Sequence, residues 1–157
     1  NQSRRQRQMC IRDRLNYIKL KEFLTPSQKE SLLKQAHETT DWIVHKSSKS
    51  GKLSPLHFKR IDTHIVGSKE LLMMMKPNTI QDWHTDMKGR NAVLIYPLTD
   101  DYAPCEVGED RITFPALINT QVKHRVVNNN NIRVNFQVPF EESMEEAYEL
   151  LRNRLSD

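Results

Sequence analysis

The chain has 157 residues, of which 37% are hydrophobic and 28% are charged, and these values are typical of one globular domain with a single core. No apolar run approaches the roughly 20 residues that would cross a bilayer, so we expect no membrane insertion and a cytoplasmic protein. The only cysteines are Cys10 and Cys105. Two cysteines exclude both a disulfide framework and a zinc site of the CxxC type.

The formal net charge of +4 would ordinarily suggest a nucleic-acid partner. Residues 1–14 contain five arginines and one aspartate, which accounts for the whole excess and leaves residues 15–157 formally neutral. We therefore expect no nucleic-acid partner. Because residues 1–14 also lack the apolar stretch of a signal peptide, we interpret them as a non-native or disordered basic segment, a genuine basic arm being the alternative. Residues 15–157 are expected to form one domain.

Capping signals predict one helix before and one after a series of short strands. Thr25 and Gln28 form a capping box around Pro26, which predicts a helix over about 26–45, and Ser143 with Glu146 predicts a second helix over 143–155. A loop is expected over 47–55 and a tight turn at the asparagine run 128–131. Strand patterns occur at 61–66, 70–76, 80–85, 92–98, 111–115, 121–127 and 132–138. This order predicts a mostly β protein with flanking helices, a double-stranded β-helix (jelly roll or cupin-like barrel) with its core at about 61–140.

The segment IRVNFQV, residues 132–138, alternates cleanly between apolar and polar side chains. Arg133, Asn135 and Gln137 therefore share one face of a strand. A surface strand with an apolar inner face is the simple interpretation. If the two helices cover the apolar face instead, the polar face lines the barrel, and a buried arginine there needs an anionic ligand.

Two histidines and an aspartate have the spacing of a metal site. In WHTD, His84 and Asp86 share a parity along an extended chain, and His124 follows 40 residues after His84. Alone, His124 between two valines is typical of a hydrogen-bonded core histidine, and a single His-x-Asp can arise by chance. Together the three form the two-histidine, one-carboxylate set used for non-haem Fe(II). Arg133 lies nine residues after His124 and can hold a carboxylate through two parallel hydrogen bonds.

The stretches WHTD, RNAVLIYPL and NTQVKHRVVNNNNIRVNFQV give residues 65–140 a resemblance to the Fe(II)/2-oxoglutarate-dependent dioxygenases. The likeness is greatest to the aspartyl/asparaginyl β-hydroxylase-like and prolyl hydroxylase-like branches. It implies that His84, Asp86 and His124 bind Fe(II), that Arg133 binds the distal carboxylate of 2-oxoglutarate, and that no further catalytic residue is needed. It also implies that 2-oxoglutarate and dioxygen are consumed to hydroxylate an unidentified small molecule or protein side chain. Halogenating relatives lack the carboxylate, so Asp86 favours hydroxylation.

Several supporting roles remain open from the sequence. Asn91, Asn135 and Tyr96 are candidates for 2-oxoglutarate binding or for positioning the iron ligands, with structural roles as the alternative. We expect Trp83 to pack in the core, a substrate contact being the alternative. Residues 99–110 should form either a flap over the site or a solvated loop. The competing function is a cupin-like metal-binding or sensing protein without turnover.

Overall fold

The computed structural model describes residues 15–46, 50–67 and 69–155. The predicted basic segment 1–14 and residues 47–49 of the predicted loop lie outside the described residues. The elements are β1 (Tyr17–Lys19), α2 (Pro26–Glu38), β2 (Leu56–Ile61), β3 (Glu70–Met75), β4 (Ile80–His84), β5 (Ala92–Pro97), β6 (Cys105–Val107), β7 (Asp110–Ile112), β8 (Ala116–Asn119), β9 (His124–Val127), β10 (Arg133–Phe140) and α3 (Met144–Leu155).

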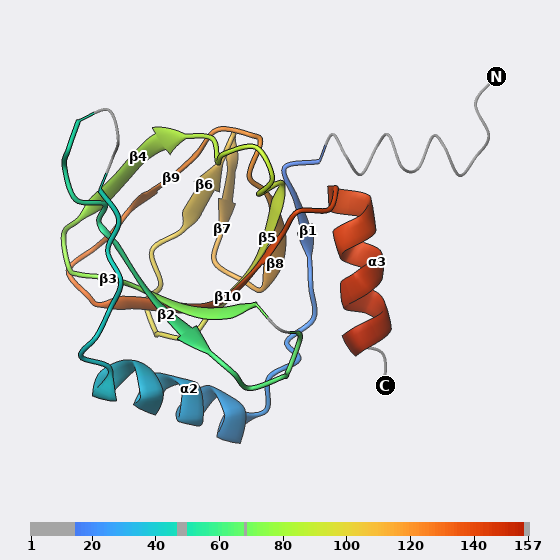
Figure 1. The fold of residues 1–157 in the computed structure, drawn as a ribbon, viewed down its shortest axis with the longest axis horizontal. Helices are drawn as coiled ribbons and strands as arrows, with labels where there is room; N and C mark the ends of the chain where they lie inside the picture. Colours follow the sequence, from blue (N-terminus) through green and yellow to red (C-terminus); the bar gives the residue numbers. More distant parts are fainter. Residues whose placement is uncertain (1–14, 47–49, 68, 156–157) are drawn as a thin grey trace.

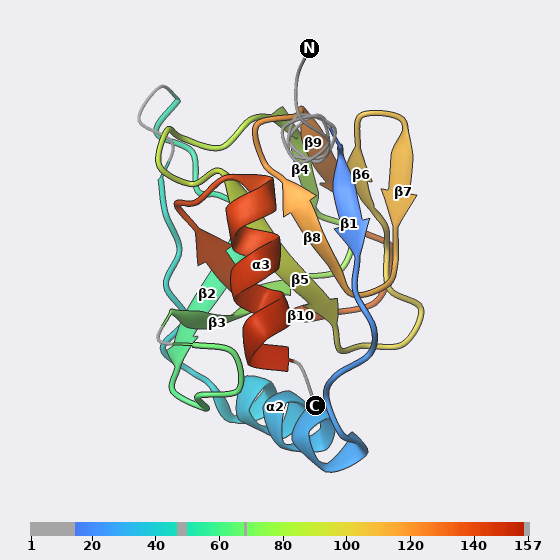
Figure 2. The same cartoon turned by 90° about the vertical axis from the view of Figure 1, so that its right-hand side faces the viewer.

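Two antiparallel sheets face each other, and both helices lie outside the larger one (Figure 1). The larger sheet has the strand order β1-β8-β5-β10-β3-β2, and the smaller sheet has the order β4-β9-β6-β7. Helix α3 lies across the larger sheet and α2 lies below it, as the turned view in Figure 2 shows. This arrangement confirms the predicted β-rich barrel with flanking helices. No helix in the described part of the chain is long and apolar enough to cross a membrane.

The packing confirms that the polar face of β10 lines the barrel. Val134, Phe136 and Val138 belong to an apolar cluster that includes buried residues of both helices. Arg133 and Gln137 lie on the opposite face and line the pocket between the sheets. Residues 133–138 are all buried, which excludes the surface strand that the alternation alone allowed.

Both predicted helices exist, but the first is shorter than predicted. The capping box of α2 forms as predicted, because Thr25 Oγ1 accepts from Gln28 N and Gln28 Oε1 accepts from Thr25 N. The helix ends at Glu38 rather than at residue 45. The chain after Thr39 is rich in β-branched and aromatic residues, and Ile43 bridges to Phe58 of β2.

Several strand predictions are wrong in position. The strand predicted at 61–66 lies instead at Leu56–Ile61, and the strand predicted at 121–127 forms only over His124–Val127, as β9. The segment 99–110 contains β6, with Cys105 and Val107 buried, so it is neither a flap nor a wholly solvated loop. The asparagine run joins strands of different sheets, and none of its residues has a positive φ. Its turn is held by side chains: Asn128 Nδ2 donates to the carbonyl oxygens of Lys76 and Asn131.

Candidate metal centre

Two neighbouring strands bring the predicted ligands together. His84 is the last residue of β4 and His124 is the first residue of β9, and the two are direct partners across the antiparallel pair. Their ring centroids lie 4.2 Å apart. A β-bulge between Gln81 and His84 changes the direction of the side chains at the end of β4. As a result, the side chains of Gln81 and His84 both line the pocket.

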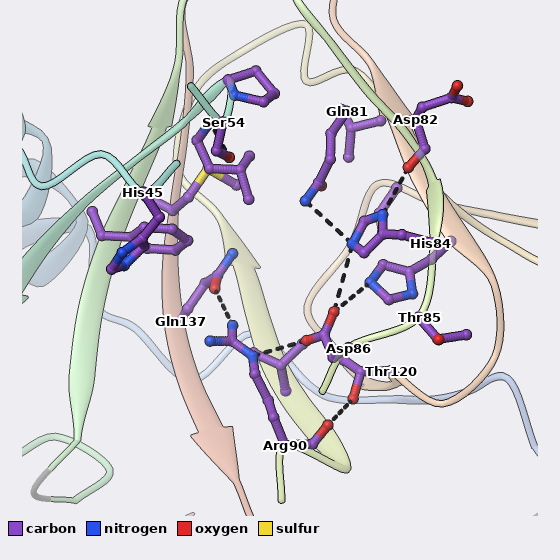
Figure 3. Close-up of a pocket in the computed structure, with 18 of the residues that line it drawn as sticks. His45, Ser54, Gln81, Asp82, His84, Thr85, Asp86, Arg90, Thr120 and Gln137 are labelled. Carbon is purple, nitrogen blue, oxygen red and sulfur yellow. Dashed lines mark hydrogen bonds and ion pairs between the residues drawn. The ribbon is translucent and has the colours of Figure 1, made fainter. Parts of the chain in front are cut away.

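Asp86 completes the cluster from the loop that follows β4. Its backbone N–H donates to Thr120 O at 3.0 Å, which anchors the loop beside β9. Asp86 Oδ1 lies 3.5 Å from His84 Nε2 and 3.1 Å from His124 Nε2 (Figure 3). The potential ligand atoms of the three residues all lie within 4.8 Å of one another. Two imidazoles and one carboxylate so arranged fit a single Fe(II) and leave other coordination positions open.

The second nitrogen of each imidazole is also fixed. His84 Nδ1 lies 2.7 Å from Asp82 O, and His124 Nδ1 lies 2.8 Å from Val122 O. Each Nδ1 therefore donates to its carbonyl oxygen, and each Nε2 is directed at Asp86, where it can bind a metal ion once it has given up its proton. Backbone carbonyls thus orient both rings for metal binding.

The charges around Asp86 keep it ionised. Burial opposes ionisation, but hydrogen bonds from His124 and His84, together with the Arg90 guanidinium, hold the pKa of Asp86 well below its usual range. The hydrogen bond to Asp86 raises the pKa of His84, against the opposing effect of its burial. A metal cation that binds here would replace the protons shared among these groups.

Arg90 was not predicted from the sequence as a site residue, although it lies four residues after Asp86. Arg90 Nε lies 2.9 Å from Asp86 Oδ2, the oxygen turned away from the imidazoles. Arg90 Nη2 donates to Gln137 Oε1 at 3.4 Å, and the carbonyl oxygen of Arg90 accepts from Thr120 Oγ1 at 2.7 Å (Figure 3). These contacts tie the loop of Asp86 to β10 and to the turn that precedes β9.

Arg133 lines the same pocket and is almost fully buried, at 1% exposure. Its Nε donates to Ala103 O at 2.9 Å, and its guanidinium carbon lies 4.0 Å from the ring centroid of Tyr102. No carboxylate among the described residues pairs with it, and its Nη2 has no hydrogen-bond partner among them. Asn135, also buried, donates from Nδ2 to the Tyr102 hydroxyl at 2.7 Å, while its Oδ1 has no such partner.

The neighbouring Arg125 points the other way, as the strand alternation predicts. It lies on the outer face of the smaller sheet, where Nε contacts Glu106 Oε2 at 2.7 Å. Its guanidinium also covers the ring of Trp83 at 4.7 Å. Trp83 is 42% exposed at the pocket rim, so the prediction that it packs in the core is wrong. β4 is an edge strand of the smaller sheet, and both helices lie outside the larger sheet (Figure 1).

The structure does not bring Tyr96 and Asn91 to the pocket. Tyr96 shares its strand face with Leu94, packs in the cluster beneath the helices, and meets Phe23 edge-on. Asn91 donates from Nδ2 to Glu141 O at 2.5 Å. Val93 and Ile95 are the residues of β5 that face the pocket, because side chains alternate along the strand.

The pocket between the sheets has a volume of about 990 Å³. His45 and Ser54 lie on one side of the pocket, and the metal cluster lies on the other (Figure 3). Cys105 lies in its lining, and burial raises the pKa of that thiol to about 11. A pocket of this size can hold a small dicarboxylate and still admit part of a second molecule.

The chain matches no protein-family model and no curated protein sequence. Solved structures do match it. A 2OG-Fe(II) oxygenase family oxidoreductase from Burkholderia pseudomallei has a TM-score of 0.61 at 8% identity, covering 91% of this chain and 93% of that one. This chain therefore shares the fold of that 2OG-Fe(II) oxygenase.

Two prolyl hydroxylases share this fold. The one from Trichoplax adhaerens, solved with a hypoxia inducible factor peptide fragment, has a TM-score of 0.61 at 11% identity and covers 94% of this chain and 97% of that one. A viral collagen prolyl hydroxylase from Paramecium Bursaria Chlorella virus-1, solved as a 2OG complex, has a TM-score of 0.53 at 11% identity, with coverage of 82% and 97%. The resemblance predicted from the sequence is thus confirmed for the fold.

Proposed function

We propose that this protein is an Fe(II)/2-oxoglutarate-dependent dioxygenase that hydroxylates a small molecule or a protein side chain. One observation carries the proposal: a two-histidine, one-carboxylate cluster and a buried arginine without a carboxylate partner line the same pocket. A buried cation is costly unless an anion compensates it. A metal-binding cluster together with a site for an anion is what a metal-chelating dicarboxylate requires.

The residues divide into three tasks. His84, Asp86 and His124 would hold the iron, and Arg133 would bind the distal carboxylate of 2-oxoglutarate through the unpaired Nη2. Asn135 is beside Arg133 on the same strand face and offers its free Oδ1 as a further polar contact. Bound together, iron and 2-oxoglutarate supply the oxidising chemistry: dioxygen and 2-oxoglutarate give succinate and carbon dioxide, and one oxygen atom enters a substrate C–H bond.

The remaining lining would exclude water from the reacting groups. Met73, Val93, Ile95, Ile118 and Val126 are buried apolar residues that line the pocket. They lower the local dielectric, which strengthens the attraction between Arg133 and a carboxylate. The viral neighbour was solved with 2-oxoglutarate and the Trichoplax neighbour with a peptide, and these ligands support the choice of co-substrate and of peptides in a substrate screen.

Anaerobic calorimetry of the Mn(II)-loaded protein with 2-oxoglutarate tests the proposal. Arg133→Met, which keeps most of the side-chain volume, should lose about 2 to 5 kcal/mol of binding free energy, since it removes one side of a desolvated charge pair. Arg125→Met is the matched control and should bind like the wild type, because Arg125 lies outside the barrel. Equal affinity in the Arg133 variant, or a larger loss in the Arg125 variant, would contradict the assignment.

Turnover is the second part of the test. The Fe(II)-loaded protein with 2-oxoglutarate and dioxygen should form succinate, and mass spectrometry of peptide and small-molecule mixtures should reveal a product that has gained one oxygen atom. Tight metal binding without 2-oxoglutarate binding would instead indicate the cupin-like metal-binding or sensing protein.

A further inference from the structure

The segment between β5 and β6 is fixed firmly over the start of β10. Leu98 N donates to Val134 O, and Val134 N donates to Thr99 Oγ1 at 3.2 Å. Asn129 Nδ2 donates to the carbonyl oxygen of Asp101, and Asn131 Nδ2 donates to the Asp101 carboxylate. These contacts hold residues 98–101 against β10 and against the asparagine run that precedes it, so the next residue, Tyr102, has a defined position.

Tyr102 and Ala103 together hold two sides of Arg133. The Tyr102 ring covers one face of the guanidinium at 4.0 Å, and Ala103 O accepts from Nε at 2.9 Å. Met75 Sδ lies 4.0 Å from Nη1. Nη2 of the guanidinium has no hydrogen-bond partner among the described residues.

The choice of an aromatic ring matters for the charge. A carboxylate beside Arg133 would fix the guanidinium but also neutralise it, and the attraction for an incoming anion would be lost. A ring face attracts the cation through its quadrupole and leaves the positive charge uncancelled. Burial raises the pKa of the Tyr102 phenol to about 12, so the ring also brings no negative charge of its own at neutral pH.

Tyr102 is fixed in turn by the strand that carries Arg133. Its hydroxyl accepts from Asn135 Nδ2 at 2.7 Å, and Asn135 is fully buried. Arg133 and Asn135 thus contact opposite parts of one side chain, the ring and the hydroxyl. Tyr102 therefore restrains Arg133 through its ring and is itself restrained by Asn135 through its hydroxyl.

We propose that Tyr102 is a positioning residue that holds the Arg133 guanidinium at one depth in the pocket and thereby selects the length of the dicarboxylate that binds. This inference rests on the proposed function, because it takes 2-oxoglutarate as the ligand of Arg133. An unrestrained arginine side chain has many rotamers, and ordering it during binding reduces affinity. Tyr102 makes that ordering part of folding.

Binding of three 2-oxo dicarboxylates to the Mn(II)-loaded full chain tests this role. Tyr102→Leu removes the ring and should weaken 2-oxoglutarate binding about 3- to 10-fold, the usual cost of ordering one flexible side chain. The preference for 2-oxoglutarate over oxaloacetate and 2-oxoadipate, which are one carbon shorter and longer, should fall toward one. Tyr102→Phe keeps the ring and should retain most of the preference.

Tyr17→Leu is the matched control, because Tyr17 packs against Phe114, with ring centroids 5.6 Å apart, rather than against the Arg133 guanidinium. It should change melting temperature without changing the preference among the three ligands. An equal loss of affinity for all three ligands in Tyr102→Leu, or no loss, would overturn the positioning role while leaving the proposed function intact. Failure of the wild type to bind any of the three would overturn both.

Discussion

Replacing Glu70 by glutamine should destabilise the protein far more than its small change in shape suggests. Glu70 is 1% exposed, and its carboxylate organises the loop between β2 and β3. Oε1 accepts from Thr63 N, Thr63 Oγ1 and His64 N at 2.7 to 3.0 Å, and Oε2 accepts from Val66 N at 2.8 Å. All four partner groups are hydrogen-bond donors, so both carboxylate oxygens of Glu70 must accept.

Glutamine can satisfy only one side of this arrangement. If its oxygen faces Thr63 and His64, its NH₂ group faces the Val66 N–H, and a buried donor is left without an acceptor. Such an orphan costs about 1 to 3 kcal/mol, and the remaining bonds lose the strengthening given by the charge. We therefore expect a loss of about 2 to 4 kcal/mol, or a melting temperature lower by about 5 to 15 °C for a domain of this size.

The destabilisation by Glu70→Gln should depend on pH. Burial opposes ionisation, but hydrogen bonds from Val66 and Thr63 outweigh it and hold the pKa of Glu70 below its ordinary value of 4.5. A lowered folded-state pKa means that the stabilisation is present above pH 4.5 and is lost as the pH falls through the folded pKa. The difference between wild type and Glu70→Gln should therefore shrink in acid.

Thermal and urea unfolding at pH 7 and at stepwise lower pH measure both effects. Glu30→Gln is the control, because Glu30 is exposed on α2 and its replacement should change stability by less than about 0.5 kcal/mol. Equal stability of the Glu70 variant and the wild type at pH 7, or a difference that grows in acid, would refute the reasoning.

Three further predictions concern the metal cluster and the core. Thr120→Val removes the hydroxyl that donates to Arg90 O and should weaken Mn(II) binding, measured by calorimetry, about 10-fold. The control Thr85→Val, at an exposed position between the ligands, should bind Mn(II) like the wild type. Equal Mn(II) affinities of the Thr120 variant and the wild type would show that this hydroxyl does not order the Asp86 loop. Mn(II) at 100 times its Kd should raise the free energy of unfolding by about 2.7 kcal/mol, and an undiminished gain in His84→Ala would place the ion elsewhere. Phe136→Ala should cost about 3 to 5 kcal/mol in urea unfolding, against little for Ile132→Ala at a position that is 49% exposed; similar losses would contradict the close packing of β10 beneath the helices.

Local signals in the sequence were enough for the starts of the helices and for the faces of strands. The capping boxes depend on residues three apart, and the alternation in 132–138 depends on neighbours, so both are written in short stretches. Alternation along residues 121–127 likewise places Arg125 on the face opposite His124. The end of α2 and the position of β2 were predicted wrongly, because pairing between Ile43 and Phe58 overrides local helix propensity.

The sequence by itself determined the chemistry that is available: two histidines and an aspartate in the order of a metal site, and an arginine on the polar face of a strand. The tertiary structure alone decided which polar groups meet. Arg90 was not recognisable as a partner of Asp86 until the turn around Thr120 closed the loop. Tyr102 reaches Arg133 across 31 positions of the chain, and Tyr96 faces the helices rather than the pocket. A strand pattern specifies that side chains alternate, but which face becomes the inside depends on what packs against the sheet, and that is decided by contacts between segments far apart in the chain.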